Sequence, residues 1–303
     1  MNKIRKLFYY IFVRPQVVLI YTWKKLSPII PAKLYIKVLF RLIFGYWMDF
    51  KNPRSFNEKL QWLKLYDKRP EYVKLVDKYE AKRIVAEVLG EKSIIPTLGV
   101  WDRVEDITFD QLPNQFVLKC THDSGGLVIC KDKTSLDIDK AKKKIAKCLK
   151  NNYYNEGKEW PYKKVPHRII AEQYIEATKD NDLFDYKLFC FGGKVRFYKI
   201  DYGRYIEHHA NYYSLDGELL PFGEQSCMPT DRFFQKPKNF ELMINYAELL
   251  SKGHPFMRVD FYNVDGEIKW GECTLYPASG FGIFIPDSWD MKLGEMLSLP
   301  NES

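Results

Sequence analysis

Three two-residue turn signals punctuate the C-terminal half of the chain. Gly-Gly at 192–193, Asp-Gly at 216–217 and Asp-Gly at 265–266 each lie between two segments with strand-like apolar patterns. Such dipeptides adopt the positive φ angles that tight hairpins need, so each one predicts a pair of antiparallel strands. Because a helical pattern over 240–251 lies between two of these hairpins, the sequence predicts an α+β fold with antiparallel sheets.

The 303 residues divide into three blocks. Residues 1–54 are basic and aromatic, with a helical pattern. Residues 55–165 begin with helices and continue into a predicted strand pair, and Ser55 with Glu58 forms a predicted capping box at the first helix. Residues 166–303 hold the hairpins. We expect compact lobes that share one site rather than a disordered chain.

Charge is concentrated at the N-terminus. The whole chain carries a net charge of +8, and residues 1–41 contain nine Lys or Arg and no Asp or Glu. This favours anionic partners: a nucleotide, an acidic glycan or an anionic membrane surface. No RNA- or DNA-binding module is visible, so we expect no nucleic-acid partner.

The N-terminal apolar runs are short. Residues 7–13 and 17–23 are both far below the ~20 residues needed to span a bilayer, and no signal-peptide cleavage pattern follows. The segment therefore either lies on a membrane surface or packs on the body of the protein. The six cysteines include no CxxC pair, which argues against a structural zinc site and indicates buried, reduced thiols. We expect a cytoplasmic protein, and the first of the two alternatives for the N-terminal segment would make it peripheral on the inner face of the cell membrane.

A first candidate site joins a strand lysine to a glycine turn. Lys119 ends the strand pattern 116–119, and Gly125-Gly126 follow before the next strand. Glycines let backbone N–H groups approach phosphate oxygens, and an ammonium group neutralises them. His122 and Ser124 would add donors. The alternative is an ordinary hairpin, since neither a Walker loop nor a GxGxxG motif is present.

A second candidate site lies in the apolar strand 169–175. Its Glu172 and the neighbouring amide of Gln173 could recognise the edge of adenine, with Glu172 accepting from the exocyclic amine. Asp185, downstream, is the candidate for the ribose. The alternative is a strand end with solvated polar groups.

A third candidate site comes from the last hairpin. Arg258 and Asp260 share one strand face, and Glu272 and Thr274 share a face of the next strand. A two-residue turn would place the two pairs on opposite faces. We therefore predict a three-residue loop, 264–266, which places Asp260 and Glu272 together, within reach of one Mg²⁺. The alternative is a surface Arg–Glu pair across the strands.

The order of these motifs resembles the ATP-grasp superfamily. More closely, three segments resemble the TupA-like ATP-grasp family, which is linked to teichuronopeptide and capsular polysaccharide synthesis: 56–60, 118–126 and 172–174. The resemblance covers about residues 50–298, and the string Lys-Cys-Thr-His-Asp-Ser-Gly-Gly at 119–126 is its most specific part. It implies two α+β lobes that hold ATP between antiparallel sheets, together with the N-terminal helical segment.

The resemblance also implies roles for ATP-binding residues. Lys119 matches the superfamily's phosphate-binding strand lysine, and Lys78 matches a lysine of the preceding lobe that also reaches phosphate. Glu172 and Ile175 match the adenine hinge.

For the metal and the chemistry, Asp260 and Glu272 match the Mg²⁺ carboxylates. Arg258 matches the arginine that stabilises the tetrahedral intermediate. Thr274 stands at the third metal-ligand position, where Asn is usual, and its hydroxyl is a poorer ligand for a second Mg²⁺.

The expected activity is that of an ATP- and Mg²⁺-dependent carboxylate–amine ligase in cell-surface polysaccharide or teichuronopeptide biosynthesis. Its acceptor would be an anionic glycan, a uronate or an amino acid, bound by the loops 201–209 and 277–284. One alternative is a capsule glycosyltransferase that uses a nucleotide sugar, for which Asp-Asn-Asp at 180–182 resembles the DxD metal motif. Another is a non-catalytic, membrane-associated scaffold.

Overall fold

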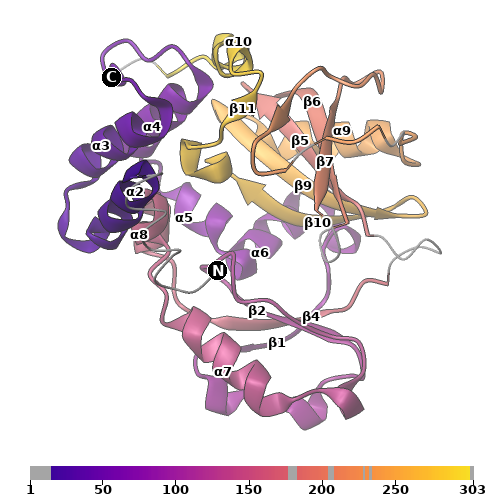
Figure 1. Ribbon diagram of the computed structural model, residues 1–303. Coiled ribbons are helices and arrows are strands. Elements are labelled where there is room, and N and C mark those ends of the chain that lie inside the picture. Colours follow the sequence, from indigo (N-terminus) through magenta and orange to yellow (C-terminus); the bar gives the residue numbers. More distant parts are fainter. Residues whose placement is uncertain (1–14, 177–182, 204–207, 228, 232–233, 301–303) are drawn as a thin grey trace.

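Two antiparallel sheets organise the molecule (Figure 1). The computed structural model describes residues 15–300 except 177–182, 204–207, 228 and 232–233. One sheet has four strands in the order β1-β4-β2-β3, and the other has five in the order β10-β9-β5-β6-β7. A two-stranded sheet, β11-β8, adjoins the larger one. The predicted α+β class with antiparallel sheets is confirmed.

The strands are β1 (Thr97–Trp101), β2 (Phe116–Cys120), β3 (Val128–Cys130), β4 (Ile169–Gln173), β5 (Asp185–Phe191), β6 (Lys194–Tyr202), β7 (His209–Tyr213), β8 (Gly223–Glu224), β9 (Phe256–Val264), β10 (Glu267–Thr274) and β11 (Phe284–Ile285). The α-helices are α2 (Pro15–Lys25), α3 (Ala32–Phe44), α4 (Phe56–Tyr66), α5 (Glu71–Val76), α6 (Lys78–Leu89), α7 (Ile138–Leu149), α8 (Tyr154–Gly157), α9 (Phe240–Ser251) and α10 (Ser288–Met296).

The four-stranded sheet is covered by α7. Strand β2 alternates buried and half-buried residues, as expected for a sheet with one face packed on a core. Ala141, Ile145 and Cys148 lie on one face of α7 and join the core beneath the sheet. The opposite face of the sheet turns toward the larger lobe (Figure 1), so side chains on that face are placed to meet it.

The central strand of the five-stranded sheet, β5, is buried on both faces. Every residue of β5 is buried, and α9 covers one side. Stacked and edge-on aromatic rings fill much of this core, among them Phe189, Phe197 and Phe256. A polar side chain that points into such a sheet needs a partner, because burial without one costs free energy.

The last hairpin differs from its predicted register. Val264 pairs with Glu267, so the turn has two residues, both with positive φ: 53° at Asp265 and 99° at Gly266. The predicted three-residue loop is therefore wrong. A bulge at Gly271 shifts the register again, because Trp270 pairs with Phe261 while the residue after the bulge pairs one position further along β9.

One strand and one helix pack in the lobe of a neighbouring sequence block. Strand β4, from the third block, pairs with β1 and β2 of the second, so the boundary at 165/166 falls next to a strand of the smaller sheet. Helix α4, from the second block, packs on the larger lobe, where Phe56 contacts Phe256 and Phe284. It also lies against α10.

The basic N-terminal segment packs on the body through α2 and α3. Trp23 stacks on Tyr35, and the Tyr35 hydroxyl donates to the carbonyl of Glu156 at 3.2 Å. Lys158 donates to the carbonyl of Ser27. In the part of the chain that the structure describes, no helix is long and apolar enough to cross a membrane.

Candidate active site

A buried carboxylate joins two lysines on the face of the smaller sheet. Glu172 on β4 lies across from Val117 on β2, and its two carboxylate oxygens form ion pairs with Lys82 of α6 and Lys119 of β2. Burial would raise the pKa of Glu172, but the charges of Lys119 and Lys82 outweigh it and lower the pKa. Lys82 also donates to the Ile95 carbonyl at 2.6 Å. Glu172 is therefore held as a carboxylate between two cations.

The glycine loop is held by Lys78 and Asp123. Lys78, the first residue of α6, donates from Nζ to the Asp123 carbonyl at 2.7 Å. The Asp123 carboxylate accepts from the backbone N–H groups of Ser124 at 2.7 Å and Gly125 at 3.2 Å. These two N–H groups therefore already converge on an anionic oxygen. Backbone N–H groups arranged in this way can equally bind a phosphate oxygen.

Gly126 and His122 have packing roles in this loop. A Cβ on Gly126 would lie 2.1 Å from the Sγ of Cys148, so only glycine lets the loop approach α7 this closely. His122 is buried and stacks on His167 with ring centroids 3.6 Å apart. Burial, followed by the charge of His167, lowers the pKa of His122 to about 4. The ring is therefore neutral near pH 7, and its Nε2 lies 3.2 Å from the Asn151 carbonyl.

The opposite wall of the site is a network of buried charges on the larger sheet. Lys187 on β5 lies across from Asp260 on β9, and its Nζ is 2.6 Å from carboxylate oxygens of both Asp185 and Asp260. Burial would lower the pKa of Lys187, but Asp185 and Asp260 raise it, so the ammonium is retained. Arg258 binds Asp260 with a two-pronged contact, Nε and Nη2 each donating at 2.7 Å.

Glu272 completes this wall and reaches toward the smaller lobe. The bulge at Gly271 places Glu272 directly opposite Asp260, and Arg258 Nη2 donates to Glu272 at 2.9 Å and to the Thr274 hydroxyl at 3.0 Å. Burial would raise the pKa of Glu272, but Arg258, Lys187 and Lys78 lower it to about 2. The side chain is still 42% exposed, so the carboxylate is ionised and accessible.

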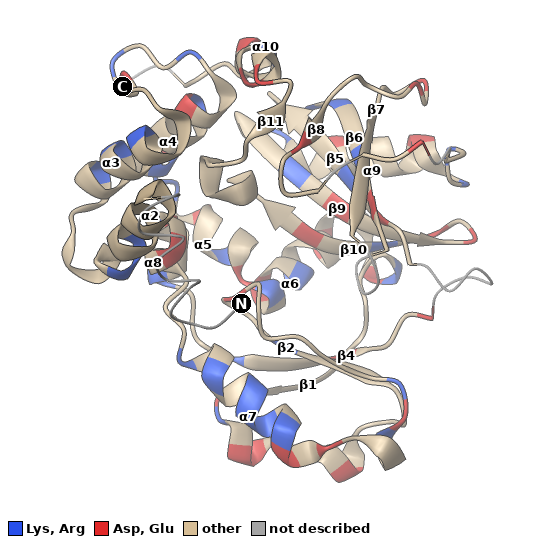
Figure 2. Ribbon diagram, viewed as in Figure 1, with Lys and Arg blue, Asp and Glu red and all other residues tan. Residues whose placement is uncertain are grey.

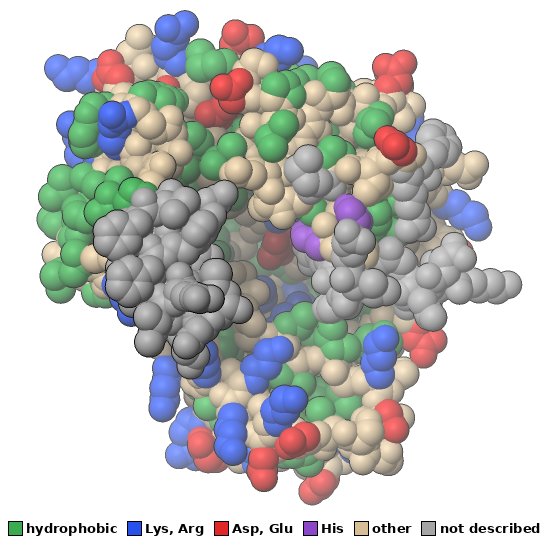
Figure 3. Space-filling view, in the orientation of Figure 1, with side chains coloured by type: hydrophobic (Ala, Val, Ile, Leu, Met, Phe, Trp, Pro, Cys, Tyr) green, Lys and Arg blue, Asp and Glu red, His purple; other side chains and the backbone are tan. Residues whose placement is uncertain are grey.

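Charged residues of the two lobes therefore face one another. Figure 2 shows acidic positions on β9 and β10 across from basic positions on α6. Figure 3 shows a hollow between the lobes with acidic and basic side chains in its depth. The positive charge of Lys78, on the wall of the smaller lobe, lowers the pKa of Glu272 on the opposite wall, so the two walls interact electrostatically.

The sequence-based predictions missed four residues of this network: Lys187, Lys199, Asp201 and Glu224. Lys199 lies 3.3 Å from Asp201 and 3.2 Å from Glu224. A sequence signal for these residues was present. Charged residues alternate with apolar ones within two strand patterns, in Asp-Tyr-Lys at 185–187 and in Lys-Ile-Asp at 199–201. This period-two pattern places the charges on one face.

The donor set suits a divalent cation. Among the described residues of the network, five carboxylates oppose three cations, an excess of two negative charges: Asp185, Asp201, Glu224, Asp260 and Glu272 against Lys187, Lys199 and Arg258. Hard oxygen ligands are those that Mg²⁺ prefers. Glu272 is the accessible carboxylate, and Thr274 offers a hydroxyl beside it.

Other predicted residues lie at the edges of the site. Gln173 is the exposed last residue of β4, and its backbone N–H donates to the Pro96 carbonyl at 3.0 Å. Ile175 follows the strand and is half-buried. Asp185, assigned to the ribose from the sequence, lies in the carboxylate network beside Lys187. The DxD-like residues 180–182 lie outside the described part of the chain.

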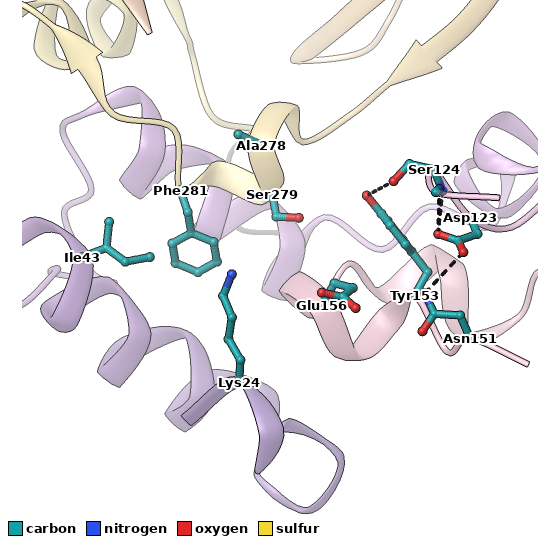
Figure 4. A pocket seen from close by; sticks show the side chains of 11 residues that line it. Lys24, Ile43, Asp123, Ser124, Asn151, Tyr153, Glu156, Ala278, Ser279 and Phe281 are labelled. Atoms are coloured by element: carbon teal, nitrogen blue, oxygen red, sulfur yellow. Dashed lines mark hydrogen bonds between the residues drawn. The ribbon is translucent and has the colours of Figure 1, made fainter. Parts of the chain in front are cut away.

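A cavity of about 520 Å³ adjoins the glycine loop (Figure 4). Its wall combines the loop, α8, the N-terminal helices and the segment after β10: Lys24, Ile43, Asp123, Ser124, Gly125, Asn151, Tyr153, Glu156, Ala278, Ser279 and Phe281. Lys24 points toward the Phe281 ring, and Glu156 lies between this pair and the glycine loop. The cavity is thus positive at one end and acidic nearer the loop.

The segment that roofs this cavity has an uncommon backbone. Ala278, Ser279 and Gly280 have consecutive positive φ angles of 47°, 53° and 65°. Buried side chains hold them there: Gln61 donates to the carbonyl of Gly280, and Lys64 donates to that of Ser279 at 2.8 Å. Strained backbone that the surrounding structure enforces is typical of binding sites.

Comparisons with known proteins identify the family of the chain. A family model described as TupA-like ATPgrasp matches residues 58–298. Among solved structures, the D-alanine–D-alanine ligase from Bacillus anthracis complexed with ATP has a TM-score of 0.42 at 17% identity, over 80% of this chain and 66% of that one. The Helicobacter pylori D-alanine–D-alanine ligase has a TM-score of 0.44 at 13% identity, over 82% of this chain and 68% of that one.

The ATP-grasp ligase PsnB, complexed with a minimal precursor, Mg and ADP, has a TM-score of 0.40 at 10% identity, over 72% of this chain and 57% of that one. The chain thus spans just under two thirds of the B. anthracis ligase and a little over half of PsnB. A search of curated proteins gave no match.

Proposed function

The chain belongs to the TupA-like ATP-grasp family, and from this premise we propose that it is an ATP- and Mg²⁺-dependent ligase that joins a carboxylate to an amine. Its proposed setting is cell-surface polysaccharide or teichuronopeptide biosynthesis. The proposed substrates are a uronate or amino-acid carboxylate and an amine acceptor, in keeping with the basic body of the protein.

The observation that carries the proposal is the opposition of charge across the hollow. Lys78 and Lys119 lie on the wall of the smaller lobe, beside backbone N–H groups that converge on an anionic oxygen. Asp260 and Glu272 face them from the larger lobe, and among the described residues of their network carboxylates outnumber cations by two. A polyphosphate between the walls would meet cations on one side, and on the other a site for the metal that accompanies nucleotide phosphates.

In the proposed reaction, a carboxylate oxygen of the substrate attacks the γ-phosphorus of ATP and ADP leaves. The amine nitrogen then attacks the acyl carbon, phosphate leaves and the amine loses a proton. Bound Mg²⁺ would supply charge neutralisation at the phosphates. Lys78 and Lys119 would offset charge on the transferring group.

Arg258 would stabilise the oxyanion of the second step. Its Nε and Nη2 hold Asp260, Glu272 and Thr274. Among the described residues no acceptor bonds Nη1, so this nitrogen is the donor that we assign to the substrate oxygen.

The cavity beside the glycine loop is the proposed acceptor pocket. Lys24 at its far end suits the carboxylate of an amino-acid acceptor, and the acidic groups of Glu156 and Asp123 nearer the loop suit its ammonium group. This polarity directs the amine toward the phosphate-binding loop, where the acyl carbon would be formed. Tyr153 and Phe281 provide aromatic walls for the apolar part of the ligand.

The direct test is product formation. The protein would be incubated with ATP, Mg²⁺, a panel of carboxylates that includes glucuronate and poly-γ-glutamate, and a panel of amino acids. The proposal expects ADP and amide in equal amounts, with turnover about 10²-fold lower or more in Glu272→Gln. Transfer of sugar from a nucleotide sugar, with no amide from any pair in the panels, would contradict it.

A further inference from the structure

A second cavity shares no lining residue with the cavity beside the glycine loop. Its volume is about 420 Å³, and it is formed where the N-terminal segment meets the end of α4 and the segment that follows α8. Its lining residues are Pro28, Ile29, Ile30, Pro31, Ala32, Lys64, Leu65, Lys68, Tyr154, Lys158, Trp160 and Lys163. Four of these are lysines, and among the described residues that line the cavity none is an acid.

Two of these lysines, Lys64 and Lys158, are buried, and Lys158 is the one whose contacts show the charge of the cavity. Its residue is only 2% exposed, its φ is 58°, and its Nζ donates to the carbonyl of Ser27. The same Nζ lies over the rings of Tyr35 and Tyr154, at 5.1 and 4.8 Å from their centroids. Burial, followed by the positive charge of Lys163, lowers the pKa of Lys158. A left-handed, buried lysine that faces another lysine would be stabilised by an added anion.

The cavity opens beside exposed apolar side chains. Ile29, which lines it, is 79% exposed, and Leu26 and Leu34 nearby in the chain are also exposed. Leu19 and Tyr21 on α2 extend the exposed apolar surface, and Figure 3 shows hydrophobic side chains gathered at the edge where α2 and α3 lie. Exposed apolar groups beside clustered lysines are typical of helices that lie in a membrane interface.

We propose that the cavity lined by Lys68, Lys158 and Lys163 binds the phosphate of an anionic membrane lipid headgroup, while Ile29 and its apolar neighbours enter the acyl-chain boundary. Lysines near an anionic leaflet attract it electrostatically, and the apolar rim explains why a lipid fits better than free phosphate. This site is independent of the proposed ligase activity, because none of its ligand-binding side chains belongs to the hollow between the lobes.

The test compares matched charge reversals in vesicle binding. Lys158 is buried, so its substitution risks the fold. Lys68 and Lys163 are exposed and are the better targets. Lys68→Glu/Lys163→Glu should bind mixed phosphatidylglycerol and phosphatidylcholine vesicles about tenfold more weakly or worse. Lys143→Glu/Lys147→Glu, which makes the same change of charge at exposed positions of α7, should bind within about twofold of the wild type.

A second variant separates a lipid from free phosphate. Ile29→Ser should weaken vesicle binding about tenfold while leaving the thermal shift caused by inorganic phosphate unchanged. Thermal shift with ATP and Mg²⁺ serves as the folding control for every variant. Equal losses from the two double variants, no binding to phosphatidylglycerol vesicles, or a phosphate effect without any effect of Ile29→Ser on vesicle binding would each overturn the proposal.

Discussion

Asp260 lies directly opposite Glu272 on the last hairpin, although the turn between their strands would by itself place them on opposite faces. The extra residue at the Gly271 bulge turns the side chains that follow it in β10 to the other face of the sheet. Glu272 therefore lies on the same face as Asp260. Arg258 then contacts both carboxylates from the same side. The proposed metal site therefore depends on one inserted residue as well as on the acids themselves.

Glu172→Gln should destabilise the fold of the smaller lobe. The change removes the carboxylate shared by Lys82 and Lys119 and leaves the buried Lys82 without its counter-charge. Breaking a buried ion pair from one side costs about 3 kcal/mol. Urea unfolding would measure this loss. Glu176→Gln, at an exposed position just beyond the same strand, is the control and should change stability by no more than about 0.5 kcal/mol.

Gly126→Ala should destabilise the protein, and Gly125→Ala should not. A Cβ at 126 would lie 2.1 Å from Cys148 Sγ, whereas a Cβ at 125 meets nothing closer than the Asp123 carboxylate at 3.9 Å. We expect a loss of about 1–3 kcal/mol for the first change and less than about 1 kcal/mol for the second. Thermal unfolding of the two variants provides the comparison. Equal stability would mean that the loop does not pack on α7 as described.

The ionised carboxylate of Glu272 should contribute to the free energy of unfolding near neutral pH and lose that contribution in acid. Its pKa falls from 4.5 to about 2 on folding, so its contribution is fully present above pH 4.5 and is lost as the pH falls toward 2. The difference in unfolding free energy between wild type and Glu272→Gln should therefore shrink between about pH 5 and about pH 3. Glu267→Gln alters a carboxylate on the same strand that is 80% exposed, and it should give a small difference throughout.

Lys24→Ala should weaken acceptor binding and leave ATP binding intact. Lys24 lines the proposed acceptor pocket, while neighbouring Lys25 lies over the Tyr21 ring outside it. We expect the KM of the amino acid that supports turnover to rise about tenfold in Lys24→Ala, the effect of losing one charge contact, with the KM of ATP unchanged. Lys25→Ala is the control. A rise in both KM values would instead indicate a general disturbance of the N-terminal helices.

Much of the larger lobe could be predicted from the sequence because its signals are local. The turns after β5 and β9 and helix α9 were all visible as dipeptides or periodic patterns. The proximity of Asp260 and Glu272 was also predicted, but from a three-residue loop that does not exist. An isolated glycine inside a strand pattern is a signal for a bulge, and Gly271 offered it, but the predicted register did not use it.

The partners of the charged groups could not be predicted from the sequence. Glu172 was expected to face adenine, yet its oxygens bind Lys82 and Lys119, which come from other elements. Lys187 was overlooked because a single lysine in an apolar strand has no visible partner until β5 pairs with β9. Long-range ion pairs are set by tertiary packing, which local patterns do not encode.

Calorimetric titration of ATP, with Mg²⁺ and with a chelator, tests the central claim most directly. Wild-type protein should bind ATP more tightly with Mg²⁺ than with the chelator. In Glu272→Gln and in Asp260→Asn, this increase in ATP affinity should be smaller by a factor of about ten or more. Combining them should add little, because either change disables the same metal site. Glu272 is partly exposed, so its variant keeps the test valid if Asp260→Asn unfolds. An undiminished Mg²⁺-dependent gain in Glu272→Gln would contradict the placement of the metal between these two carboxylates.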